Sequence, residues 1–230
     1  MNSPSGHSRG GSRRDGLSLF SSGLNPRKIE LIDRHGTGDS LLDIGCGNGL
    51  YPLATLHRFA RVLQIDLVDR RSPKARDIPF QAMNAVAVGS VGQRFDTVLC
   101  FDIIEHLDDD ESFVRTVRGI CDGCLIGSVP ADDDAVLRAI GLTHVHHVDK
   151  THRREYSRET LAALLGKAGF INVTVMPQLG EGLVYAPHAL ASGSLVSKVI
   201  ARILIALNML LCRMGVFRNA SVADWLFVAR

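Results

Sequence analysis

The sequence carries almost no net charge and lacks the cysteine pattern of a disulfide-rich protein. Its 26 basic and 24 acidic residues leave a formal charge of +2, which is too small to indicate a nucleic-acid partner. Five scattered cysteines, an odd number, do not form a disulfide framework, so a reducing, cytoplasmic setting is expected. Cys121 and Cys124 form a single C-x-x-C, and no second pair accompanies them to complete a metal site.

Two parts of the chain differ in composition from the rest. Residues 1–16 are rich in Ser, Gly and Arg without the apolar core region of a secretory signal, so we expect a disordered tail there. The remaining residues, 17–230, are expected to form a single domain, because the 46% hydrophobic content is enough to bury a substantial core. An insertion at 182–221 lies between two strand-like segments near the C-terminus.

The insertion contains an unusually apolar, helix-like stretch at 195–214. From Ile203 to Cys212 only Asn208 is polar, yet the stretch is too short and too interrupted to indicate a membrane-spanning helix. A helix that is apolar all round must bury its surface, so two interpretations are open. One is an interface in a homodimer or between domains, and the other is peripheral contact with a membrane or a lipid-like substrate.

Strand-like and helix-like segments alternate along most of the chain. The expected strands are residues 41–44, 60–66, 79–85, 95–101, 125–129, 170–176 and 222–229, and the expected helices are residues 27–35, 50–59, 111–121 and 157–168. Such alternation is typical of a doubly wound α/β fold, with a mostly parallel sheet and helices on both faces. Acidic runs at 108–110 and 132–134 precede helix-like segments, and we interpret them as helix caps rather than metal ligands.

The most informative stretch is a glycine loop directly after the first strand. Gly45, Gly47 and Gly49 occupy alternate positions, and Asp43 stands two residues before the first of them. A nicotinamide-binding loop has the spacing G-x-G-x-x-G instead, which disfavours a dehydrogenase. An acid facing the ligand suits a molecule that carries an ammonium group and no pyrophosphate, such as S-adenosylmethionine.

Polar residues follow the glycine loop at regular intervals, near the ends of successive strands. Asp66 comes 23 residues after Asp43, and Asn84 and Asp102 follow at intervals of 18 each. Because the carboxyl ends of parallel strands line one crevice, we expect these side chains to converge there. The two oxygens of Asp66 can each accept one hydroxyl of a ribose.

These motifs resemble those of the class I S-adenosylmethionine-dependent methyltransferases, especially the type 11 and type 23 small-molecule enzymes. The resemblance runs from about Asn25 to Arg230, with 182–221 as the exception. The matching segments are LLDIGCGNG at 41–49, QID at 64–66, FDTVLCFDIIEHL at 95–107, LAALLGKAGF at 161–170 and WLFVAR at 225–230. It implies a Rossmann-like methyltransferase fold with an antiparallel last strand, and S-adenosyl-L-methionine as the cofactor.

The resemblance also implies roles for individual residues. Asp43 and the first glycines would frame the methionine end of the cofactor, Asp66 would hold the ribose, and Leu67 would pack beside the adenine. Asn84 stands where the family usually has an aspartate that accepts the adenine amino proton. The cofactor-binding residues so predicted are Asp43, Gly45, Cys46, Gly47, Gly49, Asp66, Leu67, Asn84, Ala85, Phe101 and Asp102.

A histidine-rich segment at 144–152 follows the fifth strand and is expected to overhang the crevice where a substrate enters. Three interpretations are open. His147 or His152 could act as a general base, because an imidazole titrates near neutral pH. The histidines could instead orient the loop, or bind a metal, although no helical i,i+4 pair or paired cysteine supports that and no metal ligand is assigned. His144 and His146 are predicted to contact the substrate.

Glu105 and His106 follow the fourth strand. We interpret them mainly as residues that order this loop by hydrogen bonding, and we expect His106 to contact the substrate. The predicted function is methyl transfer from S-adenosylmethionine to a small-molecule or lipid-linked acceptor, at oxygen. The alternative is a catalytically silent regulatory or assembly subunit that binds the cofactor. The expected location is cytoplasmic, with peripheral membrane contact or a homodimer through 195–214.

Overall fold

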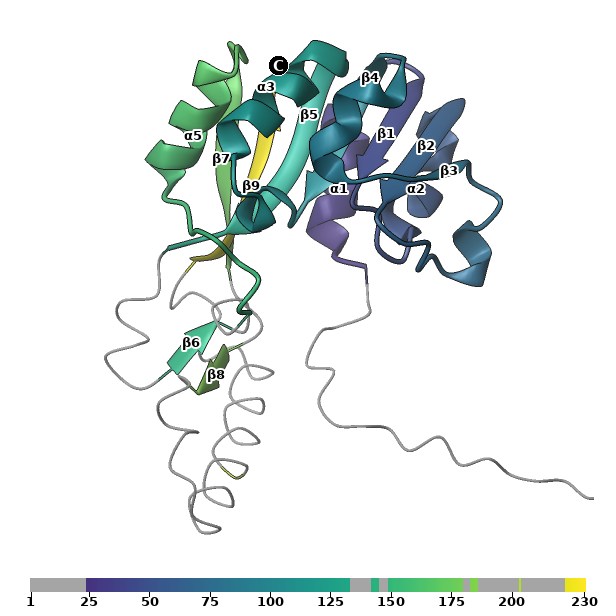
Figure 1. Cartoon of the computed structure of the whole chain (residues 1–230). Coiled ribbons are helices and arrows are strands. Elements are labelled where there is room, and N and C mark those ends of the chain that lie inside the picture. The colour runs from purple at the N-terminus through teal and green to yellow at the C-terminus, as the bar shows by residue number, and fades with distance from the viewer. Residues whose placement is uncertain (1–23, 133–141, 145–148, 180–182, 186–202, 204–221) are drawn as a thin grey trace, which may run out of the picture.

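The computed structural model describes residues 24–132, 142–144, 149–179, 183–185, 203 and 222–230. These described residues form a seven-stranded sheet in the order β3-β2-β1-β4-β5-β9-β7 (Figure 1). Its strands are β1 (Ser40–Ile44), β2 (Arg61–Asp66), β3 (Phe80–Ala82), β4 (Phe95–Phe101), β5 (Cys121–Pro130), β7 (Val173–Leu179) and β9 (Val222–Ala229).

The direction of the strands confirms the predicted sheet. β1 runs parallel to β2 and β4, β2 to β3, and β4 to β5. β9 lies between β5 and β7 and is antiparallel to both. The carboxyl ends of the five parallel strands therefore meet at one edge of the sheet, where ligands of doubly wound folds bind.

Helices cover both faces of the sheet, as Figure 1 shows. The apolar side chains of α1 (Pro26–His35) join one core cluster, and those of α3 (Asp110–Ile120) and α5 (Arg158–Lys167) join another. Successive strand residues alternate between the clusters: Leu41 packs with α1, and Leu42 packs with α3 and α5. This is why the parallel strands have continuous apolar runs.

Two helix starts match their sequence signals. Asn25 directly precedes Pro26, the first residue of α1. Its side-chain oxygen accepts a hydrogen bond from the Arg27 N–H. Ser157 and Thr160 form a reciprocal capping box at the start of α5. Both arrangements satisfy N–H groups that a helix leaves without partners in its first turn.

Several predicted boundaries were wrong. The helix expected at 50–59 is divided into α2 (Leu50–Ala54) and a 3-10 turn, η1 (Leu56–Arg58), because the Thr55 hydroxyl bonds back to the Tyr51 carbonyl at 3.0 Å. The strand expected at 170–176 begins only at Val173, because N–H groups before it bond to the Arg230 carbonyl. The strand expected at 79–85 is limited to β3, and the 3-10 turn η3 (Ala85–Val91) follows.

β5 begins four residues earlier than the sequence predicted, so Cys121 and Cys124 both lie inside the strand. Both thiols are buried. Burial raises the pKa of Cys121 to about 12, whereas metal binding and redox chemistry need an accessible thiolate. The Cys124 thiol donates to the His35 carbonyl at 3.2 Å, so it has a structural contact within the core.

Several predictions fall outside the described residues. They concern the tail at 1–16, the helix expected after the acidic run at 132–134, and most of the insertion at 182–221, of which β8 (Leu183–Tyr185) and Ile203 are described. β8 pairs antiparallel with β6 (Leu142–His144). Among the described residues, no helix has the length and hydropathy needed to span a membrane.

Candidate active site

The glycine loop after β1 turns at the carboxyl edge of the sheet. Gly45, Gly47 and Gly49 have φ angles of 71°, 52° and 72°, a region that disfavours side chains. The Gly45 N–H donates to the Ile65 carbonyl of β2 at 2.8 Å, which ties the loop to the neighbouring strand. A Cβ on Gly45 would collide with the Ile103 side chain, whereas one on Gly47 would meet nothing within 4 Å. The backbone at Gly47 therefore faces open space that a ligand can occupy.

Asp66 lies at the end of β2, against the glycine loop. Its Oδ2 accepts the Gly47 N–H at 2.9 Å, and its Oδ1 accepts the Leu67 N–H at 2.7 Å. Each carboxylate oxygen can accept more than one hydrogen bond, so both can still receive a ribose hydroxyl. The Leu67 side chain is 65% exposed and offers an apolar surface that a flat ring such as adenine would cover.

A cavity of about 450 Å³ opens beside the glycine loop and Asp66. Its volume lies within the usual range for a small-molecule site. Its lining residues are Gly45, Ile65, Asp66, Leu67, Arg70, Met83, Asn84, Ala85, Ile103, His106, Leu107 and Thr151. The cavity thus joins five predicted cofactor-binding residues to a predicted substrate residue, His106.

Asn84 lines the cavity, as expected, but its side chain also caps η3. Its Oδ1 accepts the Val86 N–H at 3.2 Å. The same oxygen has a second lone pair, so acceptance of an adenine amino proton stays a prediction.

Asp43 is buried within β1, behind the glycine loop. Its Oδ2 has no hydrogen-bond partner among the described residues. Burial, with the negative charge of Asp66, raises the pKa of Asp43 to about 7, against the opposing effect of a hydrogen bond from Gln64. A cationic group bound nearby would favour the ionised carboxylate.

A buried lysine, which the sequence did not reveal, faces the end of β4. Lys28 of α1 places Nζ 2.6 Å from Oδ2 of Asp102 and 5.0 Å from the centre of the Phe101 ring. Burial alone would lower the pKa of Lys28, but the charge and hydrogen bond of Asp102 outweigh it and raise that pKa. The Ser128 hydroxyl holds the other oxygen of Asp102. Opposite charges therefore lie side by side at Asp102, a predicted cofactor-binding residue.

One sequence signal could have identified Lys28. It occupies the same face of α1 as Leu31 and Ile32, three and four residues later, and all three are buried. A lysine within an apolar helical stripe needs a buried partner of opposite charge. The predicted site residue Asp102 was the candidate for that partner.

Glu105 and His106 belong to η4 (Ile104–His106), the 3-10 turn after β4. The prediction that both residues order the loop by hydrogen bonding holds for the backbone of Glu105 and the ring of His106. The Glu105 carbonyl accepts the Arg153 N–H at 2.8 Å, and Nδ1 of His106 lies 3.0 Å from the Thr151 hydroxyl. It does not hold for the Glu105 carboxylate, which is fully buried and has no hydrogen-bond partner among the described residues.

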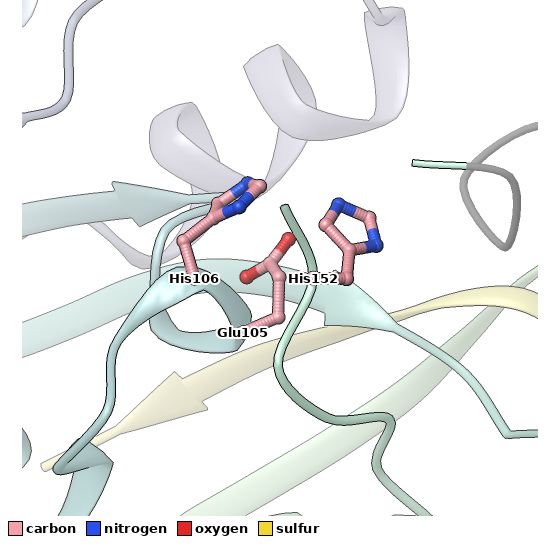
Figure 2. A group of neighbouring side chains, drawn as sticks. All are labelled: Glu105, His106 and His152. Atoms are coloured by element: carbon pink, nitrogen blue, oxygen red, sulfur yellow. The ribbon is translucent and has the colours of Figure 1, made fainter. Parts of the chain in front are cut away.

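Burial, followed by the nearby charge of Asp102, raises the pKa of Glu105 well above its usual range. The Glu105 carboxylate lies beside the rings of His106 and His152 (Figure 2). The two ring centres are 4.6 Å apart, in an edge-to-face arrangement. One ligand atom from each of the three residues lies within 4.8 Å of the other two, so the group could hold a metal ion.

The remaining predicted residues are less directly placed. A Cβ on Gly49 would collide with the side chains of Ala75 and Arg71, and Gly49 does not line the cavity. The Cys46 thiol is buried, which raises its pKa to about 12. His144 is buried on β6. His146 and His147 lie outside the described residues, so their roles in substrate contact and catalysis stay predictions.

Comparisons with known proteins identify the family and the fold of the chain. Residues 20–175 match the family model described as "Methyltransferase domain". The chain is 34% identical over 104 residues to the ubiquinone biosynthesis O-methyltransferase of Chromobacterium violaceum, and the match covers 40% of this chain and 44% of that protein. The enzyme of the same description from Ruegeria pomeroyi is 31% identical over 121 residues, or 42% of this chain and 48% of that protein. The chain therefore matches less than half the length of these curated relatives.

Solved structures show the same fold. An S-adenosylmethionine-dependent methyltransferase from Archaeoglobus fulgidus superposes with a TM-score of 0.59 at 18% identity, over 89% of this chain and 92% of that one. Phosphoethanolamine N-methyltransferase 2 from Haemonchus contortus, in complex with S-adenosyl-L-methionine, superposes with a TM-score of 0.57 at 15% identity, over 89% of this chain and 52% of that one. At these identities the likeness concerns the fold alone.

Proposed function

The chain belongs to the class I S-adenosylmethionine-dependent methyltransferase family, and from that membership we propose that it transfers a methyl group to a hydroxyl oxygen of a small-molecule or lipid-linked acceptor. The observation that carries the proposal is the cavity of about 450 Å³, whose lining includes Gly45, Asp66 and Leu67 as well as His106 and Thr151. The first group of residues suits the cofactor and the second suits an acceptor, so we call the part of the cavity at His106 and Thr151 its acceptor end.

The residues at the carboxyl edge of the sheet fit the cofactor. The buried Oδ2 of Asp43 lacks a hydrogen-bond partner within the described part of the chain, and the backbone at Gly47 faces open space. Asp66 offers two acceptor oxygens for a ribose. When bound, S-adenosylmethionine supplies an already activated methyl group on a sulfonium centre.

The charges of Lys28 and Asp102 complement the methionine end of that cofactor. The ammonium of Lys28 would attract its carboxylate, and the carboxylate of Asp102 would attract its ammonium. Nζ of Lys28 lies 2.6 Å from Oδ2 of Asp102, so the two charges are already positioned to bind the opposite charges of the amino-acid group. With an activated methyl donor, the protein contributes mainly by orienting the two molecules and excluding water.

The acceptor end of the cavity supplies groups that can handle a proton. A hydroxyl must lose its proton as it is methylated, and an imidazole nearby is suited to that task. His106 and Thr151 line the cavity, and His152, a predicted general base, lies beside His106.

The choice of oxygen is supported by the curated relatives, which are named ubiquinone biosynthesis O-methyltransferases. The apolar run from Ile203 to Cys212 supports contact with a hydrophobic or lipid-linked acceptor. It equally supports peripheral contact of a cytoplasmic protein with a membrane, or an interface in a homodimer. The small net charge favours an acceptor other than nucleic acid.

The direct test uses S-adenosylmethionine labelled in its methyl group. The protein is incubated with soluble and lipid fractions of a cell extract, and with matched pairs of hydroxyl and amine compounds of the same skeleton. Label in the hydroxyl compounds or in a hydroxylated extract component is expected. Label confined to amines would contradict the choice of oxygen, and cofactor binding without any transfer would favour the silent regulatory subunit.

A further inference from the structure

Three potential metal ligands meet at the acceptor end of the cavity. Glu105 and His106 come from η4 and His152 from the segment before α5, so the fold brings together residues that are far apart in the sequence. Their side chains point toward one another, with the Glu105 carboxylate beside the two imidazole rings (Figure 2). One ligand atom from each residue lies within 4.8 Å of the others.

The Glu105 carboxylate is the most informative of the three groups. It is fully buried, and neither of its oxygens accepts a hydrogen bond within the described residues. An ionised carboxylate in such a place costs several kcal/mol unless a positive charge compensates it. Lys28, a buried cation whose charge acts on Glu105, is paired with Asp102. Both carboxyl oxygens of Glu105 therefore stay available as ligands within the described part of the chain.

The His106 ring is oriented as a metal-binding imidazole usually is. Thr151 has one hydroxyl proton, which it donates to Oδ1 of Asp149 at 2.7 Å. Its oxygen must then accept the proton on Nδ1 of His106, at 3.0 Å. A neutral His106 consequently keeps its lone pair on Nε2. Such an outer hydrogen bond, ending in a carboxylate, is typical of histidines that ligate metals.

We propose that Glu105, His106 and His152 bind one divalent transition-metal cation, of the zinc class, at the acceptor end of the cavity. Two imidazoles and one carboxylate form a ligand set known from catalytic zinc and non-haem iron sites. Magnesium is disfavoured, because it prefers oxygen ligands throughout. The assignment departs from the sequence prediction, which found no metal ligand because no local spacing joins these three residues.

The geometry requires only a small closure. Ligands at about 2.0–2.2 Å from a tetrahedral zinc ion lie about 3.4 Å from one another. Contraction of separations of up to 4.8 Å therefore needs side-chain movements of about 1 Å or slightly more. Three protein ligands leave a coordination position open for an oxygen of the acceptor.

The inferred ion deepens the proposed function, on which its catalytic role rests. A cation bound to an acceptor hydroxyl lowers the pKa of that hydroxyl, so the oxygen can lose its proton to solvent near neutral pH. His106 and His152 then act as ligands rather than as bases. The ion would also position the acceptor oxygen beside His106, which lines the cavity.

The test measures metal binding independently of methyl transfer. Tag-free protein is treated with a chelator, dialysed and titrated with Co²⁺ and with Zn²⁺ by absorption spectroscopy and calorimetry. One ion per chain is expected, with a visible Co²⁺ spectrum that lacks thiolate charge transfer. Glu105→Gln should weaken binding by about 100-fold or more, since loss of even an outer-shell partner costs 10–100-fold. His152→Asn should have a similar effect.

His57→Ala provides the matched control, because His57 is an exposed histidine on η1 that pairs with Asp33 outside the cluster. It should bind the metal as the wild type does. Since Glu105→Gln replaces a buried, unpaired carboxylate, this variant should fold at least as stably as the metal-free wild type. Absence of one-to-one binding by the wild type, or unchanged affinity in both Glu105→Gln and His152→Asn, would overturn the assignment.

Failure of the metal site and failure of the proposed function give different results. Binding of S-adenosylhomocysteine depends on Asp66 and is measured on the same samples. If the cofactor binds and label is transferred equally well with and without metal, the catalytic role of the cation is wrong and the methyltransferase activity stands. If the metal binds but the cofactor does not, the site stands without the function.

Discussion

The pKa of Asp43 leads to a quantitative prediction about cofactor affinity. In the ligand-free protein, burial and the charge of Asp66 place that pKa at about 7, against an ordinary value of 3.8. A bound cationic group favours the ionised carboxylate, so the cofactor should bind the ionised form best. Asp43 would be ionised in about 90% of the molecules at pH 8 and in about 10% at pH 6. The affinity for the cofactor should therefore fall about tenfold from pH 8 to pH 6, which corresponds to about 1.4 kcal/mol of binding free energy.

Stability without cofactor follows the opposite trend, because a raised pKa means that the folded state holds its proton more tightly than the unfolded state. Asp43 should therefore destabilise the fold progressively as pH rises from about 4 to about 7. Asp43→Asn removes the ionisable group and should be more stable than the wild type at pH 8. The same variant should bind the cofactor weakly, with little dependence on pH.

The assay is calorimetric titration with S-adenosylhomocysteine at several pH values between 6 and 8. Buffers of different ionisation enthalpy report the protons released on binding, and close to one proton per cofactor is expected at pH 6. Other groups that titrate in this range, histidines among them, remain in Asp43→Asn and serve as the control. An affinity that is constant with pH in the wild type, or an equal slope in Asp43→Asn, would refute the reasoning.

Three further substitutions test separate parts of the account. Lys28→Met removes the partner of Asp102 and should lower the free energy of unfolding, measured with urea, by about 1–2 kcal/mol. It should also weaken S-adenosylhomocysteine binding at least tenfold, and an unchanged affinity would exclude Lys28 from the cofactor site. Leu67→Ala should leave the melting temperature unchanged, because Leu67 is 65% exposed, but weaken cofactor binding by about 1 kcal/mol; an equal loss of stability would contradict this. Gly127→Ala should lower stability by about 3 kcal/mol, because its Cβ would collide with a backbone carbonyl and an aromatic ring, whereas Gly166→Ala meets no neighbour and should be tolerated.

The sheet could be predicted because each strand has a local signal. Parallel strands buried on both faces, such as 95–101, are short apolar runs, and their alternation with helices limits the possible topologies. The boundaries that were wrong depend on individual side chains. Thr55 interrupts a helix through a bond to its own backbone, and Arg230 delays β7 from the far end of the chain.

The cofactor end of the site was also predictable, since the glycine loop and Asp66 are adjacent in sequence to the strands that position them. The acceptor end was not. Glu105 has the sequence context of a loop acid. Only the packed structure shows that its carboxylate is buried, has no hydrogen-bond partner among the described residues, and lies close to His106 and His152. Lys28 was missed for a related reason, because its partner lies 74 residues away.

The central claim is that the cavity beside Asp66 holds S-adenosylmethionine, and one measurement tests it most directly. S-adenosylhomocysteine and NAD are titrated calorimetrically into the wild type, Asp66→Ala and the control Asp77→Ala, which changes an exposed acid. The wild type and the control should bind one S-adenosylhomocysteine per chain and no NAD. Asp66→Ala should lose about 3 kcal/mol, or more than 100-fold, with its two charge-assisted hydrogen bonds. Equal affinity in Asp66→Ala, or a preference for NAD, would contradict the account.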